Sequence, residues 1–371
     1  MAILDQAALN DGVRGREVLA WAGYDFANSG YTTVVLTAVF NAYFVGVVAG
    51  AASWATFAWT AALAVSNLAV MLTMPAIGAR ADRHASKKRW LGLATVACVA
   101  ATAGLAGVGR GDLALALLLI VVSNYFYSMG EAISGAFLPE LARPAAFGRV
   151  SGWGWAFGYL GGMLALGLSL VWVLTAQARG EGAEQFVPVT MLITAAVYLI
   201  AAAPVFPVLR ERARPVVVAS GTSGDAAVTS TSAVAGAPAV AGSAAVTGGT
   251  AATGWLGSLA ALRDSARRTA AFPDFRRLLA TGAAYQAGIA VVIALAAVYA
   301  DQVIGFKPHE TMLLIFVVNI AAAAGAFLFG YYEDRIGHRR ALAVTLLAWI
   351  AMIVVAVAST SRPAFWVAAT L

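Results

Sequence analysis

The sequence predicts an all-α membrane protein made of two related helical halves. Three observations support this. First, 61% of the residues are apolar and only 11% are charged, whereas a soluble domain carries about a quarter charged residues. Second, the apolar residues form long runs, which favour helices because transmembrane strands are short and alternate polar with apolar residues. Third, a charged motif occurs twice in the chain.

The repeated motif is a short charged hairpin between two apolar runs. Residues 78–89 read Gly-Ala-Arg-Ala-Asp-Arg-His-Ala-Ser-Lys-Lys-Arg, and residues 330–340 read Gly-Tyr-Tyr-Glu-Asp-Arg-Ile-Gly-His-Arg-Arg. The glycines and the aspartates of the two copies are separated by the same 252 positions. This shared register predicts two membrane-embedded halves that carry the same hairpin.

Hydropathy predicts nine spans, each near the roughly 20 residues that a membrane helix needs. Six precede a polar interval, at residues 21–49, 54–77, 90–108, 113–137, 148–175 and 188–208. Three follow it, at residues 275–300, 311–332 and 341–359. A tenth run opens at Pro363, only nine residues before the end at Leu371, so we expect the chain to be a fragment.

These runs divide the chain into four parts. We expect a cytoplasmic N-terminal segment at 1–20, a six-helix bundle at 21–210, a cytoplasmic linker at 211–274 and an incomplete second bundle at 275–371. Residues 215–254 are almost wholly small, which predicts a disordered stretch because little apolar burial would offset its ordering. Residues 256–268 read either as a basic amphipathic segment on the membrane surface or as a solvated tether.

The distribution of Lys and Arg predicts that the N-terminus is cytoplasmic. Of the 24 cationic residues, 20 fall in the N-terminal segment, the linker and the loops on their side of the membrane. Without the long linker the ratio is still 12 to 4, and the cation-rich side is the cytoplasmic one. The net charge of +6 therefore reflects membrane topology, and we expect no nucleic-acid partner.

The hairpin resembles the signature loop of the major facilitator superfamily, which follows spans 2 and 8. Three other stretches resemble the autophagy-related vacuole effluxers and their bacterial relatives. They are Trp-Ala-Gly-Tyr-Asp-Phe-Ala-Asn-Ser at 21–29, Leu-Pro-Glu-Leu at 138–141, and Gly-Arg-Val-Ser-Gly-Trp-Gly-Trp-Ala-Phe-Gly-Tyr-Leu-Gly-Gly at 148–162. Two features depart from the family: Ala85 stands where its hairpin has Gly, and spans 10 to 12 are missing.

The resemblance implies the major facilitator fold, with two six-helix bundles related by a pseudo-two-fold axis and, here, a truncated C-terminal bundle. It implies secondary active transport by alternating access around a midplane site. The expected activity is proton-coupled efflux of an amino acid or similar small metabolite, by a monomer in the lipid bilayer of a bacterial inner membrane.

Other functions remain open at this stage. The chain could be an uptake system or a drug, sugar or peptide permease, or a non-transporting membrane sensor or scaffold. We expect no enzyme, no cofactor and no metal site. The three His residues lie in separate loops without metal-ligand spacing, and there is no phosphate-binding Gly-x-x-x-x-Gly-Lys motif.

In the superfamily that this chain resembles, the hairpin clasps a helix of the opposite half when the cytoplasmic side closes. The predicted gating residues are Gly78, Asp82, Arg83, Lys87, Arg89, Gly330, Asp334, Arg335 and Arg339. Gly allows close helix approach, and Asp can pair with Arg or with a helix N-terminus. The second copy's implied partner is the start of span 5 near Arg149, and the first copy's is the missing eleventh span. The alternative is that both loops only carry positive-inside charge.

Polar side chains in spans 1, 4 and 7 are candidates for the substrate path or proton coupling, since the resemblance places these spans around the path. They are Asp25, Asn28, Thr32, Asn124, Tyr127, Ser128, Glu131, Tyr285 and Gln286. A carboxylate at mid-depth costs about 3 kcal/mol, so we expect Glu131 to face a cavity or a partner. The hypothesis is that Glu131 carries the proton. The alternative is a structural carboxylate, which we favour for Asp25.

Gly154, Gly158 and Gly162 are spaced by four along span 5 and so leave one helix face without side chains. This face predicts either tight packing or sliding against another helix.

Overall fold

The computed structural model describes residues 5–212, 267, 272–302, 308–358 and 361–370. The predicted disordered stretch at 215–254 lies outside the described residues, as does the predicted amphipathic segment at 256–268 apart from one residue.

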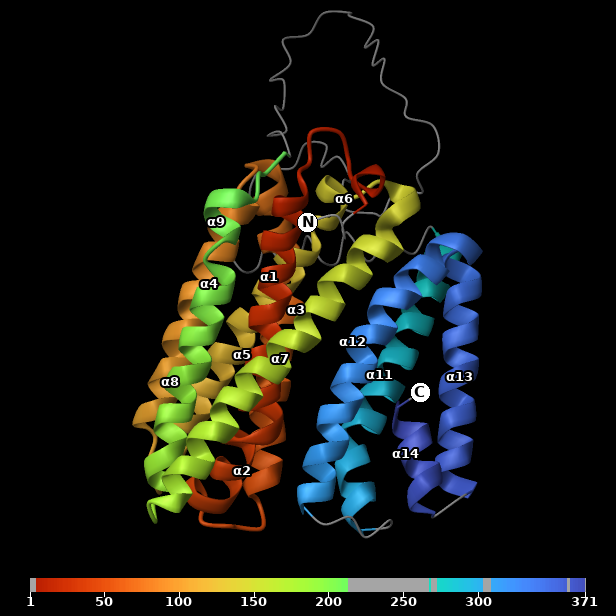
Figure 1. Ribbon diagram of the computed structural model, residues 1–371. Coiled ribbons are helices and arrows are strands. Elements are labelled where there is room, and N and C mark those ends of the chain that lie inside the picture. The colour runs from red at the N-terminus through yellow and green to blue at the C-terminus, as the bar shows by residue number, and fades with distance from the viewer. Residues whose placement is uncertain (1–4, 213–266, 268–271, 303–307, 359–360, 371) are drawn as a thin grey trace, which may run out of the picture.

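The first half of the chain forms a bundle of six long helices (Figure 1). They are α1 (Gly15–Tyr31), α3 (Ala55–Arg83), α4 (Lys87–Gly104), α5 (Leu113–Gly135), α7 (Phe147–Ala178) and α8 (Ala183–Ala202). Short helical turns connect or extend them: η1 (Gln6–Ala8), α2 (Phe40–Tyr43), η4 (Leu105–Gly107), α6 (Leu138–Leu141), η5 (Pro144–Ala146) and α9 (Val205–Val208).

The predicted first span is not one regular helix. After α1 the chain passes through a π-helical segment, η2 (Thr32–Ala38), then α2, and then a second π-helical segment, η3 (Phe44–Val48). The aromatic side chains of Tyr31, Phe40 and Phe44 in this span are fully buried. The sequence predicted the length of this span but not its irregular end.

The second half contributes α11 (Pro273–Gln302), α12 (Pro308–Ile336), α13 (His338–Ala358) and α14 (Arg362–Thr370). Figure 1 shows these helices beside the first bundle, with α12 next to α7. The last of them, α14, begins where the sequence predicted a tenth apolar run to open, and Phe365 of α14 is buried together with Leu314 of α12.

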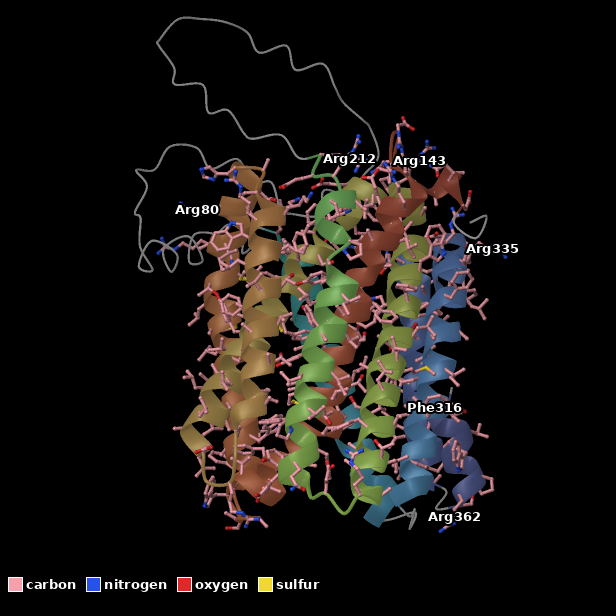
Figure 2. All side chains as sticks on the ribbon, turned by 60° about the vertical axis from the view of Figure 1, so that its left-hand side comes forward. Arg80, Arg143, Arg212, Phe316, Arg335 and Arg362 are labelled. Carbon is pink, nitrogen blue, oxygen red and sulfur yellow. The ribbon has the colours of Figure 1, made fainter. Side chains whose placement is uncertain are left out.

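Eight helices in the described part of the chain are long and apolar enough to cross a membrane. Figure 2 labels Arg80 and Arg335, one from each repeated hairpin, at the same end of the molecule as Arg143 and Arg212. We call this the basic end; Arg362 lies at the other end. Both hairpins therefore lie at the same end of the helices, as expected if the two halves of the chain are duplicates.

The glycine face of α7 packs against α1 within the first bundle. A Cβ atom placed on Gly154 would lie 2.7 Å from Asp25 Oδ2, and one on Gly158 would lie 2.9 Å from Ser29 Oγ. A Cβ atom on Gly162 would lie 2.8 Å from Thr33 Oγ1, in the segment η2 that continues α1. These glycines let two helix backbones approach closely, which is how small residues hold membrane helices together.

This packing predicts a stability difference between two glycines of α7. The change Gly158→Leu should destabilise the protein by about 1–3 kcal/mol, because the larger side chain overpacks the contact with α1. Gly167, further along α7, has no atom within 4 Å of the corresponding Cβ position among the described residues. Gly167→Leu should therefore leave the melting temperature of the detergent-purified protein nearly unchanged. Equal losses in the two variants would contradict this account of the glycine face.

Candidate functional site

The second hairpin holds the start of α7 through Asp334. The Asp334 Oδ1 atom accepts a hydrogen bond from the Gly148 N–H at 3.0 Å, and Oδ2 accepts one from the Arg149 N–H at 3.2 Å. The Arg149 Nε–H also donates to Oδ2, at 2.8 Å. A carboxylate is favoured here because the first N–H groups of a helix have no partner in the helix and carry partial positive charge. We call this contact the clasp.

Glycines bring the two helices of the clasp together. A Cβ on Gly152 of α7 would lie 3.4 Å from the Gly330 Cα atom of α12. One on Gly330 would lie 3.0 Å from the Arg149 Cα atom. Gly148 contacts Gly330 by backbone atoms. The clasp therefore joins helices from the two halves of the chain at a point where no larger side chain fits.

Aromatic and charged groups surround the clasp. The Arg149 guanidinium lies over the Tyr331 ring, 5.7 Å from its centroid, and the Trp153 indole N–H donates to the Tyr331 hydroxyl at 3.3 Å. Glu333 pairs with His338 across the turn between α12 and α13, at 2.6 Å. Arg335 and Arg339, the two cations of this hairpin that were predicted as gating residues, are exposed.

The first hairpin has a different environment. Lys87 pairs with Asp82 of its own hairpin at 3.5 Å and with Glu140 of α6 at 2.9 Å. A Cβ on Gly78 would meet no atom within 4 Å among the described residues. Within the part of the chain that the structure describes, this copy therefore binds its own bundle, whereas the second copy binds the opposite half.

The two hairpins also differ at the turn. Gly337 of the second copy has φ +83°, and the equivalent residue of the first copy, Ala85, has φ +45°. Positive φ is ordinary for Gly but unfavourable for Ala because of its Cβ atom. The departure from the family pattern at Ala85 thus occurs at a position whose backbone favours Gly.

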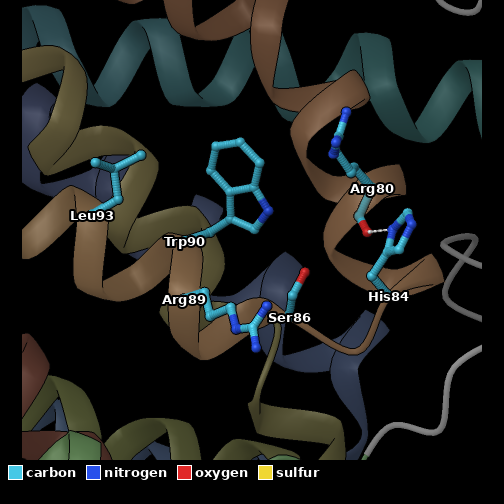
Figure 3. Close-up of a pocket in the computed structure, with 6 residues that line it drawn as sticks. All are labelled: Arg80, His84, Ser86, Arg89, Trp90 and Leu93. Carbon is cyan, nitrogen blue, oxygen red and sulfur yellow. Dashed lines mark hydrogen bonds between the residues drawn. The ribbon is translucent and has the colours of Figure 1, made fainter. Parts of the chain in front are cut away.

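A pocket of about 360 Å³ lies beside the first hairpin (Figure 3). It is lined by Arg80, His84, Ser86, Arg89, Trp90 and Leu93. The His84 Nδ1 atom lies 2.9 Å from the Arg80 carbonyl oxygen. Arg89 of the predicted gating set thus faces this pocket; the side chain of Arg83 lies outside the described part.

Two carboxylates of the first bundle interact through their charges. Asp25 of α1 is half-buried, and its carboxylate is close enough to that of Glu131 on α5 for the two to repel each other. Glu131 itself is exposed and interacts with the Tyr127 hydroxyl. The Tyr127 ring stacks on that of Tyr31, with centroids 5.1 Å apart. The helix α5, which carries Glu131, contains no Lys or Arg.

Other predicted path residues point elsewhere. Asn28 is 5% exposed and accepts a hydrogen bond from the Tyr198 hydroxyl of α8 at 2.7 Å. The Thr32 hydroxyl bonds to the backbone of its own helix. The Asn124 amide donates to Ser66 Oγ on α3 at 3.0 Å. The polar stripe on α5 therefore divides: Asn124 faces α3, and Tyr127 lies with Glu131.

The two path candidates on α11 make no contact with Asp25, Tyr127 or Glu131 among the contacts of the described residues. Tyr285 is half-buried and Gln286 is exposed. They lie on the second half of the chain, whereas Asp25, Tyr127 and Glu131 all belong to the first bundle.

Sequence reasoning missed the acidic groups that organise the basic end. The Glu211 carboxylate accepts the Lys87 N–H at 2.7 Å and the Lys88 N–H at 3.3 Å, and so caps α4. Glu17 pairs with Arg212 at 2.9 Å. The only signal for Glu140 was its place in the Leu-Pro-Glu-Leu stretch. These contacts fasten the chain after α9 to the first hairpin and to the start of α1.

The model of the family described as "Vacuole effluxer Atg22 like" matches residues 41–359. A curated relative, the uncharacterized MFS-type transporter YxiO of Bacillus subtilis (strain 168), is 24% identical over 366 residues, which are 95% of this chain and 76% of YxiO.

A solved structure is also similar. It is the major facilitator proton:xylose symporter XylE bound to 6-bromo-6-deoxy-D-glucose, with a TM-score of 0.58 and 14% sequence identity, over 95% of this chain and 78% of XylE. At this identity the likeness concerns the fold. The predicted fold class and the predicted family are thereby confirmed. This chain belongs to the vacuole effluxer Atg22-like family and is an integral membrane transporter of the major facilitator superfamily.

Proposed function

We propose that this chain exports a small polar metabolite, such as an amino acid, by alternating access, and that protons drive the export. The description of the family as vacuole effluxers supports the direction. The observation that carries the proposal is the pair of carboxylates, Asp25 and Glu131, whose charges interact in the first bundle.

The carboxylate pair suits proton coupling for an electrostatic reason. An ionised carboxylate within a membrane costs about 3 kcal/mol, and two adjacent ones also repel each other. One proton removes the repulsion and the cost of one of the two charges. Glu131 is the exposed member of the pair, while Asp25 is held against Gly154. Glu131 is therefore the proton carrier in our proposal, and Asp25 is the fixed charge that the proton offsets.

The clasp supplies the gate in this proposal. It joins the two halves at the basic end, so this side is closed when the clasp is made, and a solute to be exported can enter from that side only after the clasp breaks. The positive-inside distribution of cations supports a cytoplasmic location for this end.

Flux through proteoliposomes tests the proposed function. The complete gene product would be reconstituted and offered a panel of radiolabelled amino acids, with and without an imposed pH gradient. We expect flux of at least one amino acid that rises with the gradient. Flux that ignores the gradient would contradict proton coupling, and no flux of any solute would favour a sensor or scaffold.

Neutralising Glu131 should uncouple transport from protons. In Glu131→Gln we expect solute flux to lose its response to the pH gradient, because the side chain keeps its shape but no longer binds and releases a proton. Solute exchange at equal pH should persist. Glu184→Gln is the matched control, since Glu184 is an exposed carboxylate that pairs with Arg110. A gradient response that survives in Glu131→Gln would remove Glu131 from the mechanism.

Weakening the clasp should open the basic end. The 7% exposed Asp334 side chain loses its charge in Asp334→Asn, which should cost about 1–3 kcal/mol of clasp stability and raise the open population by about fivefold or more. Spin labels on Ala145→Cys and Arg340→Cys, one exposed position in each half, report the separation by pulsed electron resonance. The native Cys98 is buried. Asp274→Asn is the control, because Asp274 is exposed and pairs within its own helix.

A further inference from the structure

The chain before α1 forms a fixed arm on the basic end of the first bundle. We define the arm as residues 5–14. Leu9 pairs with Ala142 in an isolated β-bridge, and the Arg143 N–H donates to the Ala8 carbonyl at 3.0 Å. Leu9 and Val13 are each only 1% exposed. These contacts anchor the arm to the connection between α6 and α7, so the arm moves with the first bundle.

The arm reaches the clasp through Asp5. The Arg149 guanidinium is shared: its Nη1 atom lies 2.9 Å from Asp5 Oδ2, and its Nε atom lies 2.8 Å from Asp334 Oδ2. Asp5 and Arg149 belong to the first half of the chain, and Asp334 belongs to the second. One cation at the interface thus has two acidic partners, of which only one would leave if the halves separated.

We propose that Asp5 is the alternative partner of Arg149 that makes the clasp releasable. With the clasp closed, Asp5 and Asp334 share one positive charge and repel each other. With the clasp open, Asp5 keeps Arg149 paired and so lowers the cost of losing Asp334. Asp5 therefore shifts the balance toward the open basic end. This inference rests on the proposed role of the clasp as a gate.

The other charged groups around the clasp do not duplicate this role. Glu333 and His338 pair with each other on the side of α12 and α13, so they move with Asp334. Asp11, the other acidic residue of the arm that forms an ion pair, pairs with Arg143 at 2.9 Å. Of these groups, only Asp5 lies on the first bundle and contacts the cation that Asp334 also binds.

The substitution Asp5→Asn removes the charge and leaves the arm intact. Asp5 Oδ1 accepts the Ala7 N–H at 3.0 Å and so caps the short turn η1. Asn caps helix starts as well as Asp does. The arm's anchoring contacts at Leu9, Asn10 and Val13 do not involve Asp5. Asp11→Asn is the matched control because it breaks an arm–Arg pair of the same length that does not touch the second half.

The spin-label pair at positions 145 and 340 tests the proposal in the complete protein. In Asp5→Asn we expect the open population to fall by about two- to fivefold, the range for a partly exposed ion pair. In Asp334→Asn it should rise, and in Asp11→Asn it should not change. Asp5→Glu should return the balance toward that of the unmodified protein, and size-exclusion profiles check that each variant is folded.

The direction in which the open population changes distinguishes this proposal from one in which Asp5 only stabilises the clasp. If Asp5 only orients Arg149 for Asp334, Asp5→Asn should open the basic end as Asp334→Asn does, and the proposal is overturned. An unchanged population in Asp5→Asn, with a response in Asp334→Asn, overturns it as well and leaves the gate standing. No response in Asp334→Asn would show that the clasp is not a gate, and the inference would fall with it.

Discussion

The close approach of α7 and α12 next to Asp334 is the contact that holds the two halves of the chain together. In lipid there is no hydrophobic drive between helices, so small residues and hydrogen bonds decide which helices associate. One face of α7, with Gly154 and Gly158, meets α1, and the start of α7, with Gly148 and Gly152, meets α12. A single helix thereby belongs to one bundle and forms the contact with the other.

Hydrogen bonds between polar side chains also hold helices together in the interior of the first bundle. The Tyr198 hydroxyl lies within 3.3 Å of both Asn28 and Tyr24, and the Thr95 hydroxyl reaches Tyr24 from α4. These hydrogen bonds link α1, α4 and α8 where water cannot satisfy polar groups. Asp25 and Glu131 stand apart from this network as charged groups, which is why we assign the proton to them and not to the neutral side chains.

The sequence predicted the fold well because its signals are repetitive. Long apolar runs and two hairpins at a constant offset can be recognised without knowing which helices pack together. The orientation of a single side chain depends on that packing. Spacing put Asn28 and Asn124 on the polar faces of their helices, and the family resemblance put those helices on the path. In the structure each bonds to a neighbouring helix of its own bundle, a contact that spacing does not show. The arm was predicted only as part of a cytoplasmic N-terminal segment at residues 1–20, since ten residues without periodicity carry no sign of what they touch.

The two hairpins differ in how closely other described atoms of the chain approach them. At Gly330 the backbone of α7 leaves no room for a methyl group, whereas at Gly78 no described atom would meet one. Ala85 already occupies a left-handed turn where its counterpart remains Gly337. Among the described residues, position 330 therefore sets how near the two halves can come, and any larger side chain there would push α7 and α12 apart.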